Sequence, residues 1–404
     1  MTFDNLLEKY RKTSYSERNK GTRFEKLMQG FMKTYPPYLG KFNEVWMWNE
    51  FPFRKDFGGK DTGIDLVART VEGDYWAIQC KCYQTSSRIN KPEVDSFLST
   101  SSKTFQDELG RTTKFAQRLW ISTTDKWNHE AENTIAQQDP PVARIGLYDL
   151  RNALIDWDKL DQGIFGTAAI QKERVPKDHQ QEAINSAHEY YKSHDRGKLI
   201  MACGTGKTYT SLKIAEQETG PHGLVLFLVP SIALLGQTLN EWSTFAKLPI
   251  DAICVCSDAA ASKKTKANDD LQNIDLALPA TTDVRKVAAR IQAARERLAN
   301  PAEQEQLGMT VVFSTYQSIE VVAKAQKYLM TGEMPDDHEI TLFTKEELAQ
   351  KDAAEFAFDM IICDEAHRTT GMEESSETNS AFTLVHDNSH ILARRRMYMT
   401  ATPR

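Results

Sequence analysis

Leu199-Ile-Met-Ala-Cys-Gly-Thr-Gly-Lys-Thr208 is the stretch that decides the fold of the second half of the chain. A short apolar strand over residues 198–201 precedes a glycine-containing loop, and a helix is expected over residues 207–218. This order of strand, Gly-x-Gly-Lys-Thr loop and helix is typical of a phosphate-binding loop. The sequence departs from the usual pattern at one position, because Met201 stands where Gly or Ala commonly opens it.

Five residues of this loop carry the predicted chemistry of nucleotide binding. Gly204 and Gly206 allow backbone N–H groups to turn towards a phosphate, and Thr205 lies between them. Lys207 has the reach to contact the β- and γ-phosphates, and the hydroxyl of Thr208 is a candidate ligand for Mg²⁺.

A second stretch, residues 359–368, completes this prediction. Its apolar residues end in Asp364 and Glu365, as expected where a buried parallel strand reaches the carboxyl edge of its sheet. Asp364 is expected to hold Mg²⁺ directly or through water, Glu365 to polarise the attacking water, and His367 to complete the nucleotide site. An acidic helix cap is the alternative, but Lys207 upstream favours an ATPase core.

The composition is that of a globular protein with two or three domains, since the chain has 404 residues, of which 40% are hydrophobic and 26% charged. The net charge of −6 gives no overall signal for nucleic acid, so any DNA contact must be local. The six cysteines lie mostly in apolar runs and indicate reduced core residues. We find no leader and no long apolar run, and we therefore expect a cytoplasmic protein.

The first part of the sequence predicts a small α/β domain. Helix-spaced apolar residues follow Arg18, and further elements alternate along the chain. The strands are expected over residues 44–48, 64–69, 75–81, 118–122 and 143–148, and the helices that separate them over residues 91–99 and 127–137.

Three polar residues stand out on neighbouring strands of this domain. Asp65 begins one strand, and Gln79 and Lys81 share a face of the next. Phosphodiester hydrolysis with Mg²⁺ fits this set, with Asp65 and the Gln79 carbonyl as metal ligands and Lys81 orienting or activating water. From the spacing alone, a solvated strand face with ordinary polar residues fits equally well.

The segment 17–150 resembles the Mrr-type branch of the PD-(D/E)xK nuclease superfamily. The resemblance rests on Phe24-Glu25, on Gly63-Ile64-Asp65 and on Gln79-Cys80-Lys81. It implies a nuclease fold in which Asp65, Gln79 and Lys81 are catalytic and Glu25 is an auxiliary residue of the metal site.

The expected domains are a nuclease over residues 1–150, with an N-terminal arm over 1–16, and an ATPase lobe over 177–404. Residues 1–15 of the arm are polar and are expected to be helical. Residues 151–176 join the two domains, and the sequence leaves open whether this joint is a flexible linker or a packed connector.

The ATPase part resembles superfamily 2 helicases in the order of its motifs. Before the phosphate loop, Gln180, with Gln181 as the alternative, matches the glutamine that contacts adenine in those proteins. Ser231 and Gln237 fall in the DNA-contacting motif Ia, residues 311–318 match motif Ib, and 399–402 match motif III. The resemblance implies the first RecA-like lobe of a motor. Two helical inserts interrupt it, and a lysine cluster at 262–266 is expected to be a solvated loop.

Taken whole, the sequence resembles single-chain type ISP restriction–modification enzymes, and its residues 364–371 are also typical of type I restriction motor subunits. The resemblance implies ATP and Mg²⁺ as cofactors and double-stranded DNA as a partner. It also implies a second RecA-like lobe, a methyltransferase and a target-recognition domain, which we expect to lie outside this sequence because it stops just after motif III.

Two other functions remain open at this point. One is a helicase of repair or phage defence whose first domain binds DNA without cutting it, which Mg²⁺-dependent cleavage would exclude. The other is a nucleotide-gated scaffold with no DNA substrate, which DNA binding at low salt would exclude.

Overall fold

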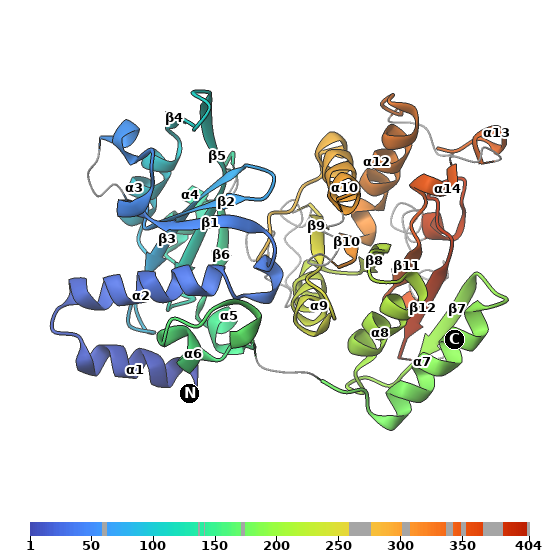
Figure 1. Ribbon diagram of the computed structural model, residues 1–404, viewed down its shortest axis with the longest axis horizontal. Coiled ribbons are helices and arrows are strands. Elements are labelled where there is room, and N and C mark those ends of the chain that lie inside the picture. The colour runs from blue at the N-terminus through green and yellow to red at the C-terminus, as the bar shows by residue number, and fades with distance from the viewer. Residues whose placement is uncertain are drawn as a thin grey trace. The chain divides into compact units, whose positions relative to one another are not determined.

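The computed structural model describes residues 1–58, 63–135, 138–140, 142–170, 174–257, 276–300, 308–336, 342–348, 353–366 and 383–401. The chain divides into two compact units. The first is Met1–Lys172 with Ile274–Pro279, and the second is Glu173–Asn273 with Ala280–Arg404. Each unit has its own sheet (Figure 1). Among the described residues, no helix is long and apolar enough to cross a membrane.

The first unit is built on a mixed sheet with the order β1-β2-β3-β5-β4, and β6 pairs with β5. Strands β1, β2 and β3 are antiparallel, whereas β3, β5 and β6 run parallel. The strands are β1 Phe42–Met47, β2 Leu66–Thr70, β3 Tyr75–Lys81, β4 Thr104–Gln106, β5 Thr112–Ser122 and β6 Val142–Ile145. The predicted bounds of β3 are thus confirmed.

Helices cover both faces of this sheet. Helix α2 (Glu17–Met32) packs against β1 and β3 on one face. Helices α3 (Lys91–Ser101) and α4 (His129–Ile135) lie on the other face, where they enclose an aromatic-rich core that includes Trp120. This arrangement confirms the α/β nuclease fold predicted from the sequence.

The segment expected to be a helical N-terminal arm does form a helix, α1 (Phe3–Thr13), but this helix is packed. Its residues Phe3, Leu6, Leu7 and Tyr10 are buried, because the spacing of these side chains gives the helix one continuous apolar stripe. Residues with this pattern bury their stripe against a neighbouring element rather than leave it in water.

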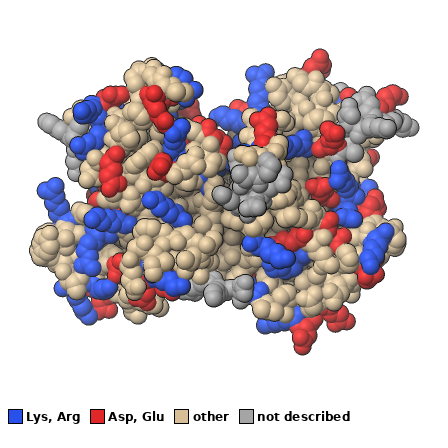
Figure 2. Space-filling view, viewed as in Figure 1, with Lys and Arg blue, Asp and Glu red and all other residues tan. Residues whose placement is uncertain are grey.

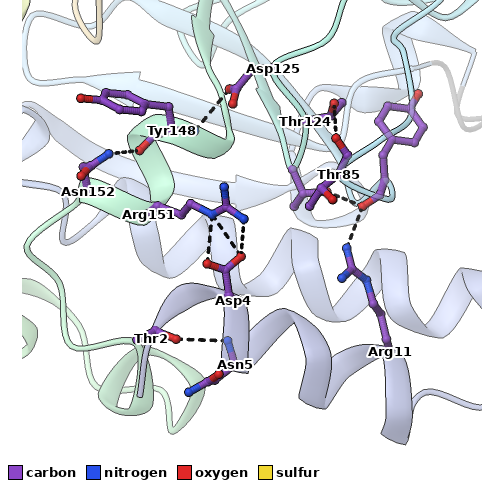
Figure 3. A network of polar contacts seen from close by, with 12 residues as sticks. Thr2, Asp4, Asn5, Arg11, Thr85, Thr124, Asp125, Tyr148, Arg151 and Asn152 are labelled. Carbon is purple, nitrogen blue, oxygen red and sulfur yellow. Dashed lines mark hydrogen bonds and ion pairs between the residues drawn. The ribbon is translucent and has the colours of Figure 1, made fainter.

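The joint at residues 151–176 is packed as far as Ile170. Helices α5 (Leu147–Asn152) and α6 (Trp157–Asp161) occupy its start, and α5 ends the predicted strand early, at Ile145. The Trp157 ring lies 4.6 Å from that of Phe3 and 5.9 Å from that of Phe31. Figure 3 shows the polar side of the same packing, where Arg151 Nη2 donates to Asp4 Oδ1 at 2.8 Å. Of the two alternatives, the structure supports the packed connector.

The sequence did not predict the hairpin formed by β4 and the first half of β5. Gln106 pairs with Thr112 across a turn in which Gly110 has φ of +69°. Most of the hairpin is polar and exposed, with Phe105 and Phe115 as its buried residues, so its hydrophobic pattern is too sparse to mark two strands.

The second unit has a six-stranded sheet of order β7-β12-β11-β8-β10-β9, in which every pair is parallel. The strands are β7 Arg196–Ile200, β8 Leu224–Val229, β9 Asp251–Val255, β10 Thr310–Thr315, β11 Met360–Cys363 and β12 Arg396–Thr400. The central strands are buried on both faces, as expected of parallel strands covered by helices. The predicted parallel-sheet lobe is confirmed.

Helices cover both faces of this second sheet as well. Helices α10 (Val284–Leu298) and α12 (Ile319–Thr331) share one core with β8, β9, β10 and β11. On the other face, the Trp242 ring of α9 (Ile232–Phe245) lies 5.0 Å from that of Phe227 and 6.0 Å from that of Phe313.

The remaining helices of this unit lie next to strands in the chain. Two short helices, α13 (Lys345–Leu348) and α14 (Ala353–Phe356), precede β11, and α7 (Asp178–Tyr191) and α8 (Lys207–Thr219) flank β7. The expected helix over residues 284–298 is confirmed, whereas the lysine cluster at 262–266 lies outside the described residues.

Arg118 of β5 is a buried cation that stabilises the first unit. Its guanidinium donates to Ser101 Oγ at 2.8 Å, Ser102 Oγ at 2.7 Å and Pro140 O at 2.9 Å, and the residue is 1% exposed. Burial lowers the pKa of Arg118, so the charge depends on these acceptors.

We expect Arg118→Ala to lower the free energy of unfolding of the first unit by about 2–4 kcal/mol, because it leaves buried acceptors without a donor. Arg111→Ala is the matched control. The Arg111 side chain is exposed in its ion pair with Asp107, so its loss should lower the free energy of unfolding by no more than about 1 kcal/mol. Urea unfolding followed by tryptophan fluorescence reports mainly on this unit, because Trp242 is the one tryptophan of the sequence that it lacks. If the two variants lost the same free energy of unfolding, the stabilising role of the buried Arg118 would be contradicted.

Candidate nucleotide and nuclease sites

The phosphate-binding loop joins β7 to α8 through two glycines in the left-handed region. Gly204 has φ of +77° and Gly206 has φ of +88°, and Gly206 is the N-cap of α8. A Cβ at Gly204 would meet no atom within 4 Å, whereas one at Gly206 would collide with the Gln180 amide. Gly206 is therefore required both by its backbone conformation and by its close neighbour, and the loop leaves the N-terminus of α8 open to an anion.

Lys207 lies between the two carboxylates that the sequence placed at the end of β11. Its Nζ is 3.2 Å from Asp364 Oδ1 and 2.9 Å from Glu365 Oε1. Burial works to lower the pKa of Lys207, but the charge of Asp364 and the hydrogen bonds to both carboxylates outweigh it and raise that pKa. Burial raises the pKa of Asp364, and Lys207 opposes this shift. The fold thus brings together residues that are far apart in the sequence.

Gln180 of α7 contacts the phosphate-binding loop directly. Its Nε2 donates to Thr205 O at 2.8 Å, its Oε1 accepts from the backbone N–H of Lys177 at 3.0 Å, and the side chain is buried. Gln181, the alternative, donates instead to Asn185 of its own helix and is exposed. Of the two candidates, Gln180 is the one at the loop.

Arg174 is a neighbour of this loop that the sequence analysis did not single out. Its guanidinium lies 4.5 Å from the centre of the Tyr209 ring, and its Nη1 is 3.0 Å from Glu241 Oε1. Its Nη2 is also close to the position of a Cβ on Gly206. An arginine in a linking segment, with no motif around it, gives no sequence signal for this placement.

The remaining ATPase predictions have mixed outcomes. Thr208 is the second residue of α8, and its Oγ1 makes no hydrogen bond among the described residues. Ser231 caps α9 by accepting from Leu234 N, and Gln237 is exposed. His367 and Thr402 lie outside the described residues.

The nuclease candidates Asp65 and Gln79 are in direct contact. Asp65 comes just before β2, and its Oδ2 accepts from the backbone N–H of Cys80 at 2.7 Å and from Gln79 Nε2. Gln79 is buried within β3. The antiparallel pairing of β2 with β3 fixes this contact.

Lys81 and Glu25 complete the charged surroundings of this site. Lys81 ends β3, is half-buried, and its amine makes no hydrogen bond or ion pair among the described residues. Burial raises the pKa of Cys80, the charges of Asp65 and Glu25 raise it further, and Lys81 lowers it. The charges of Asp65, Glu25 and Lys81 therefore all influence Cys80 in β3, the strand in which the sequence predicted a site.

This donor set fits a divalent cation such as Mg²⁺. Carboxylate and amide oxygens are the ligands that hard cations prefer. Within the described residues, His, Cys, Asp and Glu form no cluster of three or more. The candidate ligands are those predicted from the sequence, which are Asp65, the Gln79 amide oxygen and Glu25. Gln79 now presents its NH₂ group to Asp65, so its amide must turn over before its oxygen can act as a ligand.

The fold and these two sites define a class of protein: a restriction-endonuclease domain followed by a helicase-type nucleotide-binding lobe. The model of the type III restriction enzyme res subunit matches residues 173–404, more than half of the chain, and the chain belongs to this family. A restriction endonuclease model matches residues 33–165. The predicted pairing of an Mrr-type nuclease with a helicase lobe is thus confirmed.

Solved structures of type ISP enzymes resemble this chain. The ATP-dependent type ISP restriction–modification enzyme LlaBIII, solved bound to DNA, is 37% identical, with a TM-score of 0.73 over 100% of this chain and 22% of its own. A nuclease-deletion mutant of the type ISP enzyme LlaGI, in complex with a DNA substrate mimic, is 40% identical over 57% of this chain and 18% of its own, with a TM-score of 0.39.

A viral relative matches over a shorter range. The probable helicase A859L of African swine fever virus (isolate Tick/Malawi/Lil 20-1/1983) is 27% identical over 230 residues, which are 56% of this chain and 19% of the relative. This chain therefore spans about a fifth of the length of A859L and of LlaBIII.

The resemblance to type ISP enzymes predicted from the sequence is confirmed by the similarity to LlaBIII.

Proposed function

We propose that this chain is the nuclease and first motor lobe of an ATP-dependent DNA restriction enzyme. One observation carries the proposal: a phosphate-binding loop with its carboxylate pair, and an Asp–Gln–Lys set on a restriction-endonuclease sheet, occur in one polypeptide. The boundary between the two catalytic units lies in the joint at 151–176, close to the division after Lys172. The partner is double-stranded DNA, consistent with the DNA-bound state of LlaBIII.

The nucleotide site binds ATP with Mg²⁺ in this proposal. Backbone N–H groups of residues 204–207 surround the phosphates, and the Lys207 amine moves from the carboxylates to the β- and γ-phosphates. Thr208 and Asp364 hold the cation, which neutralises phosphate charge. Glu365 accepts a hydrogen bond from the attacking water and orients it, while Gln180 contacts adenine and fixes the loop through Thr205.

The nuclease site cleaves phosphodiester bonds in this proposal. Asp65, Gln79 and Glu25 hold Mg²⁺, which supplies charge stabilisation at the phosphate. The Lys81 amine donates to the phosphate oxygen or orients the attacking water, and it is available for this role because no described side chain pairs with it. The second motor lobe, methyltransferase and target-recognition domain belong to the same natural polypeptide, as in the type ISP enzymes it resembles.

The experiment is a cleavage assay with the natural protein that contains this chain. We expect it to cut double-stranded DNA when ATP and Mg²⁺ are both present, and to bind DNA without cutting it in excess EDTA. DNA binding and ATP hydrolysis without any cleavage would favour the second candidate, a helicase whose first domain only binds DNA.

A further inference from the structure

Tyr316 reaches from the end of β10 to the backbone of the carboxylate pair. It opens the short 3₁₀ turn Tyr316–Ser318, and its hydroxyl donates to the carbonyl oxygen of Asp364 at 2.8 Å. The whole side chain is buried. Because β8 lies between β10 and β11, this bond spans the end of an intervening strand.

The bond fixes the point at which the chain turns from β11 into the nucleotide site. On the other side of the same residue, the N–H of Asp364 donates to Leu228 O at 2.9 Å. The next residue, Glu365, has φ of +50°, which no other non-glycine residue in the described part of the chain shares. A bulky residue in the left-handed region is strained and persists only where its surroundings hold it there.

Packing alone does not explain the hydroxyl of Tyr316. A phenylalanine would fill the same core, whereas a buried hydroxyl is costly unless it is hydrogen-bonded. The turn that carries the ring is itself held by polar contacts, since Thr315 Oγ1 donates to Ser318 Oγ at 3.3 Å and both residues are buried. The surroundings of the ring therefore hold the hydroxyl on the carbonyl of Asp364.

We propose that Tyr316 is a positioning residue of the nucleotide site, which holds Asp364 and Glu365 in the geometry that cation and water binding require. The inference rests on the proposed ATPase function. Tyr316 does not itself contact the nucleotide. It acts through the Asp364 carbonyl, and so determines where the Asp364 carboxylate and the strained Glu365 point.

Tyr316→Phe tests the proposal, with Tyr191→Phe as the matched control. Tyr191 is another buried tyrosine of the same unit, and its hydroxyl donates to the backbone carbonyl of Arg396 at 3.0 Å, away from the carboxylates. Both substitutions remove a hydroxyl that donates to a backbone carbonyl. They are therefore expected to cost similar stability and to differ only in their effect on the site.

The first readout is the affinity for ATP, measured by calorimetric titration in Mg²⁺ and in excess EDTA. In Tyr316→Phe we expect the affinity in Mg²⁺ to fall about tenfold, the lower end for a residue that orients a metal ligand, and the affinity in EDTA to stay unchanged. Tyr191→Phe should bind like wild type in both conditions. Equal behaviour of the two variants would overturn the proposal.

The second readout needs no ligand. Hydrogen exchange of the segment 359–366 should become faster in Tyr316→Phe and remain as in wild type in Tyr191→Phe, because only the first loses the restraint on Asp364. Unchanged exchange in both variants would also overturn the inference. The wild-type titration distinguishes failure of the proposed function from failure of this inference. Absence of ATP binding by the wild type would contradict the proposed function. Normal binding by the wild type and by Tyr316→Phe alike would contradict only the role of Tyr316.

Discussion

Lys207→Ala is expected to remove ATP binding from this chain or to weaken it severely. In the proposed nucleotide site, the Lys207 amine is the cation that the loop offers to the β- and γ-phosphates, and alanine removes it without altering the backbone N–H groups. The substitution also leaves Asp364 and Glu365 facing the nucleotide without their counter-ion. Because burial already raises the pKa of Asp364, we expect that pKa to rise further once Lys207 is gone.

Calorimetric titration with ATP and Mg²⁺ measures the effect, and Lys213→Ala is the control. Lys213 lies on the same helix, α8, but its amine contacts Glu216 and the carbonyl of Phe245 rather than the loop. We expect Lys213→Ala to bind ATP as wild type does. Unchanged ATP affinity in Lys207→Ala would reject the assignment of the phosphate-binding loop.

Asp65→Ala and Lys81→Ala are each expected to eliminate DNA cleavage by the natural enzyme while ATP turnover continues. In the proposed nuclease site, Asp65 is the carboxylate in contact with Gln79 and with the N–H of Cys80, and Lys81 is the cation that ends β3. Loss of a positioned proton donor or base commonly costs about 10²–10⁴ in rate, enough to take cleavage to background. ATP turnover should survive because the residues of the two sites lie in separate units.

Two further variants make this test specific. Asp65→Asn keeps an acceptor for the N–H of Cys80 but removes the negative charge, so its loss of cleavage cannot be attributed to an unpaired backbone group. Lys114→Ala removes an exposed lysine from β5 of the same sheet and should cut like wild type. Cleavage that survives in Asp65→Ala or in Lys81→Ala would place the nuclease site elsewhere.

The sequence predicted best those parts of the molecule that local patterns determine. The loop around Lys207 and the strand that ends before Asp364 are marked by residues adjacent in the chain. The bounds of β3 follow from an apolar run that continues as an alternation of polar and apolar residues up to Lys81. The sequence also placed Asp65 at the start of one strand and Gln79 on the next, and the structure brings the two side chains into contact, with Asp65 just before β2.

Contacts made by single residues across the fold could not be predicted in this way. The bond from Tyr316 to Asp364 joins residues on strands that are not neighbours, and Arg174 approaches the loop from a segment without a motif. The helix over residues 1–15 was predicted, but its packing was missed, because charged and polar residues separate its apolar ones and make the segment polar on average.

The position of Lys207 between two carboxylates makes nucleotide entry an ion exchange rather than a simple addition of charge. Before ATP arrives, the lysine already serves as the internal counter-ion of Asp364 and Glu365. If ATP alone drew the lysine away, two neighbouring carboxylates would lose their compensation in a half-buried site. ATP that arrives together with a divalent cation avoids this loss, because one cation replaces another beside the carboxylates. We therefore expect the site to bind uncomplexed ATP more weakly than ATP with a divalent cation, and its affinity to respond more to the cation supplied with the nucleotide than to ionic strength.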